Sequence, residues 1–213
     1  MTPIDTGGFF TAHIIIRLFS SLDLGWKYSN FPSQSSATSR TPENIYVKGS
    51  REIWMSDPVF SVPINERYFE DYLPGPVFEY GPIAVTESEV VDFAKKFDPQ
   101  YIHTDPAKAA SGPFGGLIAS GWHTSSLMMR LYADNYLSSV ASLASPGIDE
   151  LRWLKPVRPG DSLWIRVTAL DSRRSKSKPD LGVVRVYVEV LNQSREVVMT
   201  VKTVNLFRRR PAP

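Results

Sequence analysis

The final third of the chain alternates between apolar and polar residues with a period of two. The clearest run covers 183–191, where valine occupies every second position from Val184 to Val190. This period is expected of a β-strand with one buried face. Turn sequences such as RPGD and NQSRE separate runs of this kind. The pattern predicts strands over 78–86, 149–157, 162–170, 183–191 and 197–207.

Two other segments have the spacing of helices. Thr86, followed three residues later by Glu89, is a capping box, and the apolar residues after it predict a helix over 86–97. That helix is expected to end near Asp98, because a proline disfavours helical geometry in the residue before it. A second helix is predicted over 121–139. Its apolar surface is broad, as in a helix that is covered on several sides.

Long strands joined by tight turns, after one buried helix, predict an α+β fold. We expect a single domain over 55–213, in which an antiparallel β-sheet wraps around a central α-helix. Residues 1–54 differ, because their segment KYSNFPSQSSATSRTPEN has no hydrophobic period. We therefore expect a flexible N-terminal extension there. One hypothesis is that translation naturally starts at Met55 instead of Met1.

Composition excludes several classes of function. The formal net charge of +2 is too small to indicate a nucleic-acid partner, and the absence of cysteine excludes disulfides, thiolate metal sites and cysteine nucleophiles. Three histidines without clustered carboxylates predict no metal site. No segment has the roughly 20 apolar residues of a membrane span, so we expect no membrane partner. A chain without cysteine fits a reducing compartment, and we expect a cytoplasmic protein.

The stretch FDPQYIHTDP places an aspartate and a histidine five residues apart, at Asp98 and His103. One interpretation is turn chemistry, in which Asp98 caps backbone amides and His103 is a surface residue or one whose hydrogen bonds are satisfied within the protein. The other is catalysis, because two prolines stiffen the loop and restrict both side chains. Small residues downstream lead into a helix at Gly121, whose free N–H groups suit a carbonyl oxygen that gains charge. An acid–base pair beside such a site is the layout for proton chemistry next to a carbonyl.

Three segments match one family in residue type and spacing: FDPQYIHTD, FGGLIASGW and LRWLKPVRPGDSL. They resemble the MaoC-like (R)-specific enoyl-CoA hydratases and acyl dehydratases, which have the hotdog fold, and the resemblance runs from Phe69 to Phe207. It implies that Asp98 and His103 are the catalytic pair and that the N–H of Gly121 binds the thioester oxygen. It also implies an acyl-CoA thioester substrate, no cofactor beyond the coenzyme A of that substrate, and a homodimer or larger even-numbered homo-oligomer.

The chain departs from this family's pattern at three positions. Gln100 and Tyr101 stand where the signature has Asn and Pro, and Ser120 stands where a histidine usually precedes the glycine. These changes bear on substrate range more than on reaction type. We therefore predict Gln100, Ser120 and Gly121 as substrate-binding residues, in an enzyme that adds or removes water across the α–β bond of an acyl thioester.

Two other functions stay open. A hotdog acyl-CoA thioesterase shares the fold and the substrate class. Such enzymes commonly carry their carboxylate on the central helix, however, and this helix has no acidic residue before Asp134. The alternative from a different class is a non-catalytic hotdog module that binds an acyl group or supports a catalytic partner.

The remaining polar and aromatic candidates have a structural interpretation beside any functional one. His123 and Thr124 are expected to pack, with a place in the pocket wall as the alternative. Asp105 is expected to cap the following turn, and Trp153 to pack on the sheet. The basic run 173–178 is expected to be a solvated loop, and attraction of the coenzyme A phosphates is its alternative role.

Overall fold

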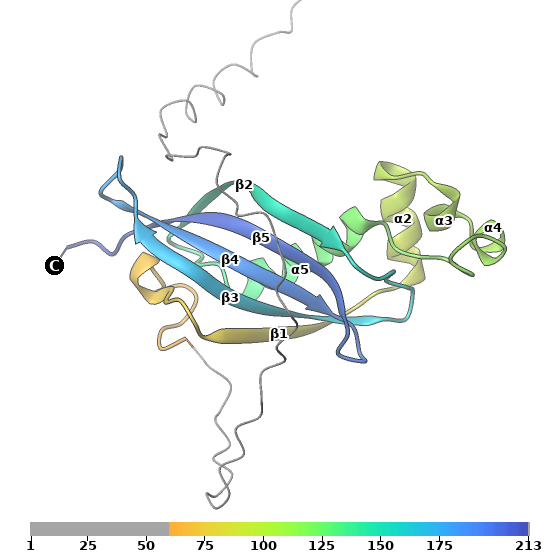
Figure 1. Ribbon diagram of the computed structural model, residues 1–213, viewed down its shortest axis with the longest axis horizontal. Helices are drawn as coiled ribbons and strands as arrows, with labels where there is room; N and C mark the ends of the chain where they lie inside the picture. The colour runs from red at the N-terminus through yellow and green to blue at the C-terminus, as the bar shows by residue number, and fades with distance from the viewer. Residues whose placement is uncertain (1–59, 213) are drawn as a thin grey trace, which may run out of the picture. The chain divides into compact units, whose positions relative to one another are not determined.

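A computed structural model describes residues 60–212, which form one antiparallel sheet of five strands in the order β1-β3-β4-β5-β2 (Figure 1). The strands are β1 (Val77–Ala84), β2 (Ser142–Trp153), β3 (Ser162–Arg174), β4 (Leu181–Leu191) and β5 (Val197–Arg208). The helices are the 3-10 turn η1 (Phe69–Asp71), α2 (Glu87–Phe97), α3 (Tyr101–Thr104), α4 (Pro106–Ala110) and α5 (Gly121–Asn135). The expected extension over 1–54 lies outside the described residues.

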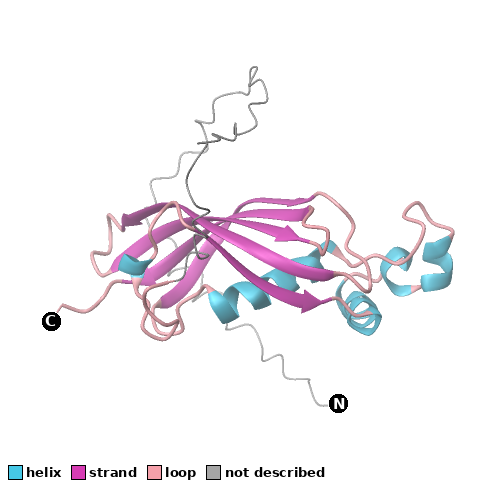
Figure 2. Cartoon of the chain, turned by 90° about the horizontal axis from the view of Figure 1, so that it is seen from below, coloured by secondary structure: helices cyan, strands magenta, loops and turns pink. Residues whose placement is uncertain are grey.

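The sheet curves over α5, and α2, α3 and α4 gather at one end of it (Figures 1 and 2). This arrangement confirms the α+β fold with an antiparallel sheet wrapped around a central helix. The buried positions of β3 alternate regularly from Leu163 to Ala169, as the sequence pattern predicts. Within residues 60–212, no helix has the length and apolar character needed to cross a membrane.

Two strands, β2 and β3, extend well beyond one end of the ranges that the sequence pattern predicts. β2 starts at Ser142 rather than at Asp149, and its pairing with β5 shifts register at three places. These irregularities break the alternation, so the first half of the strand carries no sequence signal. β3 continues to Arg174, into the expected basic loop, because backbone pairing with β4 continues after burial stops at Ala169.

The C-terminal end of α5 is held by an arginine from outside the helix. The Arg67 guanidinium donates from Nη1 to the carbonyl oxygens of Asn135, at 2.7 Å, and Tyr136, at 3.3 Å. The Tyr72 hydroxyl donates to the same Tyr136 carbonyl at 3.0 Å. The last carbonyls of a helix lack intrahelical partners, and these donors supply them. Arg67 also lies 3.8 Å above the Phe60 ring, within the aromatic cluster that fills this end of the core.

At Gly182, on β4, a strand and a 3-10 turn approach more closely than a side chain permits. A Cβ atom at this position would overlap the ring of Phe69 in η1, which is itself buried. We predict that Gly182→Ala lowers the free energy of unfolding by about 1–3 kcal/mol, the usual cost of overpacking a core. Urea denaturation measures this change.

Gly147→Ala is the matched control, because Gly147 also lies in a strand and a Cβ atom there would have no neighbour within 4 Å. Equal stability of the two variants would contradict the prediction. Adding Phe69→Leu to Gly182→Ala should recover part of the loss, since the smaller side chain can move away from the new methyl group.

Candidate active site

Helix α2 delivers Asp98 to the site. Thr86 caps the helix as predicted: its Oγ1 accepts the N–H of Glu89, and the Glu89 carboxylate accepts the N–H of Thr86. The helix ends at Phe97, and the Asp98 N–H makes the last helical bond, to the Ala94 carbonyl oxygen at 2.8 Å. Asp98 then leaves helical geometry before Pro99, which is the predicted stop.

The loop expected after Asp98 contains one helical turn, α3, which turns His103 inward. The Gln100 carbonyl oxygen accepts from the N–H of His103 at 2.9 Å and from the Thr104 hydroxyl at 3.0 Å. His103 is consequently only 5% exposed. Of the two structural alternatives for His103, the surface residue is therefore wrong, whereas a buried residue with a satisfied ring nitrogen stays open, since Nδ1 lies 2.8 Å from the carbonyl oxygen of Ile118.

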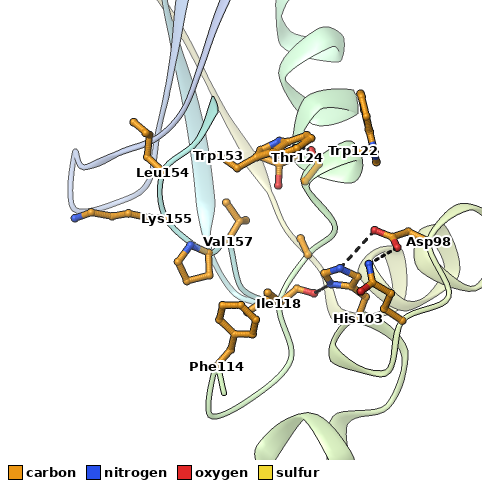
Figure 3. Close-up of a pocket in the computed structure, with 14 residues that line it drawn as sticks. Asp98, His103, Phe114, Ile118, Trp122, Thr124, Trp153, Leu154, Lys155 and Val157 are labelled. Carbon is orange, nitrogen blue, oxygen red and sulfur yellow. Dashed lines mark hydrogen bonds and ion pairs between the residues drawn. The ribbon is translucent and has the colours of Figure 1, made fainter. Parts of the chain in front are cut away.

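Asp98 and His103 face one another, with Asp98 Oδ2 at 3.5 Å from His103 Nε2 (Figure 3). The other ring nitrogen, Nδ1, lies 2.8 Å from the carbonyl oxygen of Ile118. A carbonyl only accepts, so Nδ1 carries the proton, and Nε2 of the neutral ring is an acceptor. An acceptor nitrogen thus faces a carboxylate oxygen. Such a pair can hold a donor between them, or share a proton.

The Asp98 carboxylate accepts two further hydrogen bonds. Gln100 donates from Nε2 to Oδ1 at 2.7 Å, and the Ser120 hydroxyl donates to Oδ2 at 2.7 Å. These bonds, first that of Gln100 and then that of Ser120, hold the pKa of Asp98 below its ordinary value, and a positive charge on His103 acts in the same direction. Asp98 is therefore ionised at neutral pH.

Gly121 begins α5 beside this pair, and a tryptophan lies directly against it. The indole Nε1 of Trp153 donates to the Gly121 carbonyl oxygen at 2.9 Å, and a Cβ atom at position 121 would lie 2.5 Å from Trp153 Cε2. Only glycine fits there. The Gly121 N–H makes no hydrogen bond with another described residue, as expected at the first position of a helix.

These groups border one cavity of about 470 Å³. Asp98, Gln100, His103 and Gly121 form one polar part, and Lys155 is a further polar residue of the lining. Most of the other lining residues are apolar or aromatic, namely Phe114, Ile118, Ala119, Trp122, Trp153, Leu154, Pro156 and Val157 (Figure 3). Thr124 also lines the cavity, which was the alternative to packing for that residue. The structure thus brings together Asp98, His103, Gly121 and Gln100, four of the predicted site residues.

Ser120 and His123 lie behind this wall. Ser120 is fully buried and is not among the lining residues, because its hydroxyl is turned towards Asp98. His123 stacks on Phe93 of α2, with ring centroids 4.9 Å apart, and burial lowers the pKa of His123. The packing interpretation of His123 is the one that the structure favours.

Trp153 is the site residue that sequence reasoning missed. The sequence predicts that Trp153 packs on the sheet. The side chain is instead 46% exposed and forms a wall of the cavity, next to Trp122. A tryptophan at the end of a strand gives no sign of its partner, because the contact with Gly121 depends on how β2 and α5 meet.

The other candidates lie away from the cavity. Asp105 caps α4 by accepting the N–H of Lys108 at 3.0 Å, as predicted. Asp134 pairs with Arg130 near the far end of α5. Arg173 and Arg174 lie at the end of β3 that points away from α2–α4 (Figure 1).

Comparison with known proteins gives the family. Residues 72–207 match the family model of the MaoC like domain. The uncharacterised protein YdeM of Bacillus subtilis is 32% identical over 124 residues, which are 58% of this chain and 86% of YdeM. The 3-hydroxyacyl-thioester dehydratase Z of Mycobacterium tuberculosis is 40% identical over 80 residues, which are 37% of this chain and 53% of that protein.

The fold has a close counterpart among solved structures. The MaoC-like dehydratase from Rhodospirillum rubrum is 37% identical and superposes with a TM-score of 0.64, over 68% of this chain and 99% of that one. The curved sheet around α5 is accordingly the hotdog fold, as expected. Since the family model covers well over half of the sequence, and the counterpart aligns along nearly its whole length, the chain belongs to the MaoC-like family of hotdog proteins, which includes hydratases and dehydratases.

Proposed function

We propose that this protein is an acyl-thioester hydratase or dehydratase, which adds water to, or removes it from, the α–β bond of an enoyl or 3-hydroxyacyl thioester. The observation that carries the proposal is the convergence of Asp98, His103 and the Gly121 N–H on one cavity. The name of the Mycobacterium relative, a 3-hydroxyacyl-thioester dehydratase, supports the same substrate class.

The Gly121 N–H is the donor for the thioester carbonyl oxygen. It lies at the N-terminus of α5, where the helix dipole adds a partial positive charge. Charge develops on this oxygen when water attacks the β-carbon and an enolate-like state forms. A donor of this kind contributes about 100- to 1000-fold in other enzymes.

The facing acceptors of Asp98 and His103 orient the water. One water can donate one hydrogen to Asp98 Oδ2 and the other to His103 Nε2, which leaves an oxygen lone pair directed at the β-carbon. As the C–O bond forms, the pair takes a proton from this water and a proton is delivered to the α-carbon, so that the pair ends with its initial charge. Dehydration follows the same path in reverse.

The thioester is expected to enter through the apolar part of the cavity. Phe114, Trp153, Leu154 and Val157 provide surface for an acyl chain, whereas Gln100 and His103 lie beside Asp98. The alternative function of a thioesterase would need a carboxylate on α5 near the cavity. The acidic residue of α5, Asp134, lies instead near the far end of the helix and pairs with Arg130. We expect coenzyme A to be present only as part of the substrate.

A homodimer is the expected assembly. β2 is an edge of the sheet and pairs only with β5 among the described strands. Apolar side chains are exposed along β2 and the flank of α5, including Ile148, Trp122 and Met129. An exposed edge with such neighbours is usually covered, and a second copy of β2 would extend the sheet across the two chains.

Asp98→Asn should reduce turnover at least about 100-fold while leaving the fold intact, because the amide keeps the shape of the carboxylate but does not act as a base. Loss of enoyl absorbance with short and long enoyl thioesters measures hydration, and free-thiol release measures hydrolysis in the same samples. Asp105→Asn is the matched control, since Asp105 belongs to the same loop but only caps α4. Near-full hydration by the Asp98 variant, or thiol release as the main reaction of the unmodified protein, would refute the proposal.

The pH dependence should follow the lowered pKa of Asp98. The ionised carboxylate is an active form, so the part of the loss of kcat/KM that Asp98 causes should begin only when the falling pH passes through that pKa. Gln100→Leu removes the largest cause of the lowering and should move the acid limb to higher pH. Gln193→Leu, which removes a similar amide–carboxylate bond to Asp161, should not. An unmoved acid limb in the Gln100 variant would show that another group controls it.

Light scattering should give twice the mass of one chain, and Ile148→Asp should shift the protein towards the monomer. Ile148 is 55% exposed on the edge strand, and a carboxylate there would have to be desolvated in the dimer. Leu73→Asp is the control, because Leu73 is 64% exposed but precedes β1. A monomeric unmodified protein would exclude this assembly.

A further inference from the structure

Ser120 joins the two parts of the site without lining the cavity. Its side chain is fully buried. The hydroxyl donates to Asp98 Oδ2 at 2.7 Å, and its oxygen accepts the N–H of Trp122 at 3.2 Å. One hydroxyl therefore connects the carboxylate that follows α2 to the first turn of α5.

We propose that Ser120 is a positioning residue, which fixes Oδ2 of Asp98 relative to His103 and to the N–H of Gly121. The proposal rests on the function proposed above for these three groups. It assigns Ser120 a role through Asp98, in place of the direct contact with substrate that the sequence predicted for this residue.

The donor and acceptor pattern gives the bond its direction. The N–H of Trp122 has to be accepted by the Ser120 oxygen, since it points to that atom at the start of the helix. The single hydroxyl proton is then directed at Oδ2, which accepts it as an ionised oxygen. Protonation of Oδ2 would make it a much weaker acceptor for this buried hydroxyl proton. The hydrogen bond from Ser120 thus favours the ionised form of Asp98. It occupies one lone pair of Oδ2 and leaves the other for a donor in the cavity.

The backbone of Ser120 is itself held by hydrogen bonds, so the position of its hydroxyl is well defined. Its carbonyl oxygen accepts the N–H of Thr124 at 3.0 Å and the Thr124 hydroxyl at 3.3 Å. Gly121 is the next residue and is held from the other side by Trp153. The carboxylate and the oxyanion donor are thereby tied to one short stretch of backbone. Without the hydrogen bond from Ser120 to Asp98, a shift of α2 relative to α5 would move the carboxylate away from the Gly121 N–H.

A helix cap alone predicts a different behaviour. Glycine replaces serine at an N-cap with little loss of stability, whereas alanine is clearly worse. If Ser120 only caps α5, Ser120→Gly should be almost silent and Ser120→Ala should affect stability. If Ser120 positions Asp98, both substitutions remove the same hydrogen bond and should alter Asp98 to the same extent.

The test measures Asp98 directly in the full-length protein. The carboxyl carbons of aspartate are labelled with ¹³C and titrated by NMR, and the signal of Asp98 is identified by its absence from Asp98→Asn. Ser120→Gly and Ser120→Ala should both raise the pKa of Asp98, because one of its two side-chain donors is lost. They should also lower kcat/KM at neutral pH about tenfold, as expected for one hydrogen bond to a charged group, and move the acid limb to higher pH. Ser126→Ala, on an exposed hydroxyl of the same helix, should do none of these.

The outcomes separate this proposal from the proposed function. An unchanged titration of Asp98 in Ser120→Gly overturns the positioning role, whatever the activity. A raised pKa in a protein that hydrates no enoyl thioester supports the link between Ser120 and Asp98 and rejects the enzymatic function. A raised pKa together with a shifted acid limb supports both. Since glycine is a competent N-cap, the test remains decisive if the alanine variant fails to fold.

Discussion

The position of α5 is the constraint on which the site depends. At its C-terminal end, Arg67 and Tyr72 bind the last carbonyl oxygens, and aromatic rings surround them. At its N-terminal end, Ser120 and Trp153 hold the first turn. The helix cannot slide along the sheet without breaking bonds at both ends. A backbone N–H has no rotatable side chain to adjust, so it can be a precise donor only if the helix that carries it is fixed.

The chemistry follows from the hydrogen bond of one ring nitrogen. Because the Ile118 carbonyl engages Nδ1 of His103, the other nitrogen of the neutral ring is left as an acceptor opposite Asp98. Two acceptors at this distance repel unless a donor or a proton lies between them. The protein thus creates a place that favours water or a shared proton, next to a cavity that is otherwise mostly apolar.

Much of this arrangement could be predicted from the sequence, and the remainder could not for identifiable reasons. The capping box at Thr86 and the proline after Asp98 fix the ends of α2 through local sterics, which the sequence carries in full. The valine alternation gives β4 because one face is buried. The start of β2 was missed because an edge strand with shifted register has no alternation to show. The sequence predicts that Ser120 binds substrate, whereas its hydroxyl is turned towards Asp98, because the direction of a side chain at a helix start depends on what packs beside it.

The close packing of Trp153 against Gly121 couples the side chains that can be accommodated at two positions 32 residues apart. Any side chain at 121 needs a smaller residue at 153, while loss of the indole alone removes a donor from the 121 carbonyl. A substitution at 121 alone therefore creates a clash, and a substitution at 153 alone leaves a carbonyl oxygen without its indole donor, so the two positions can change freely only together.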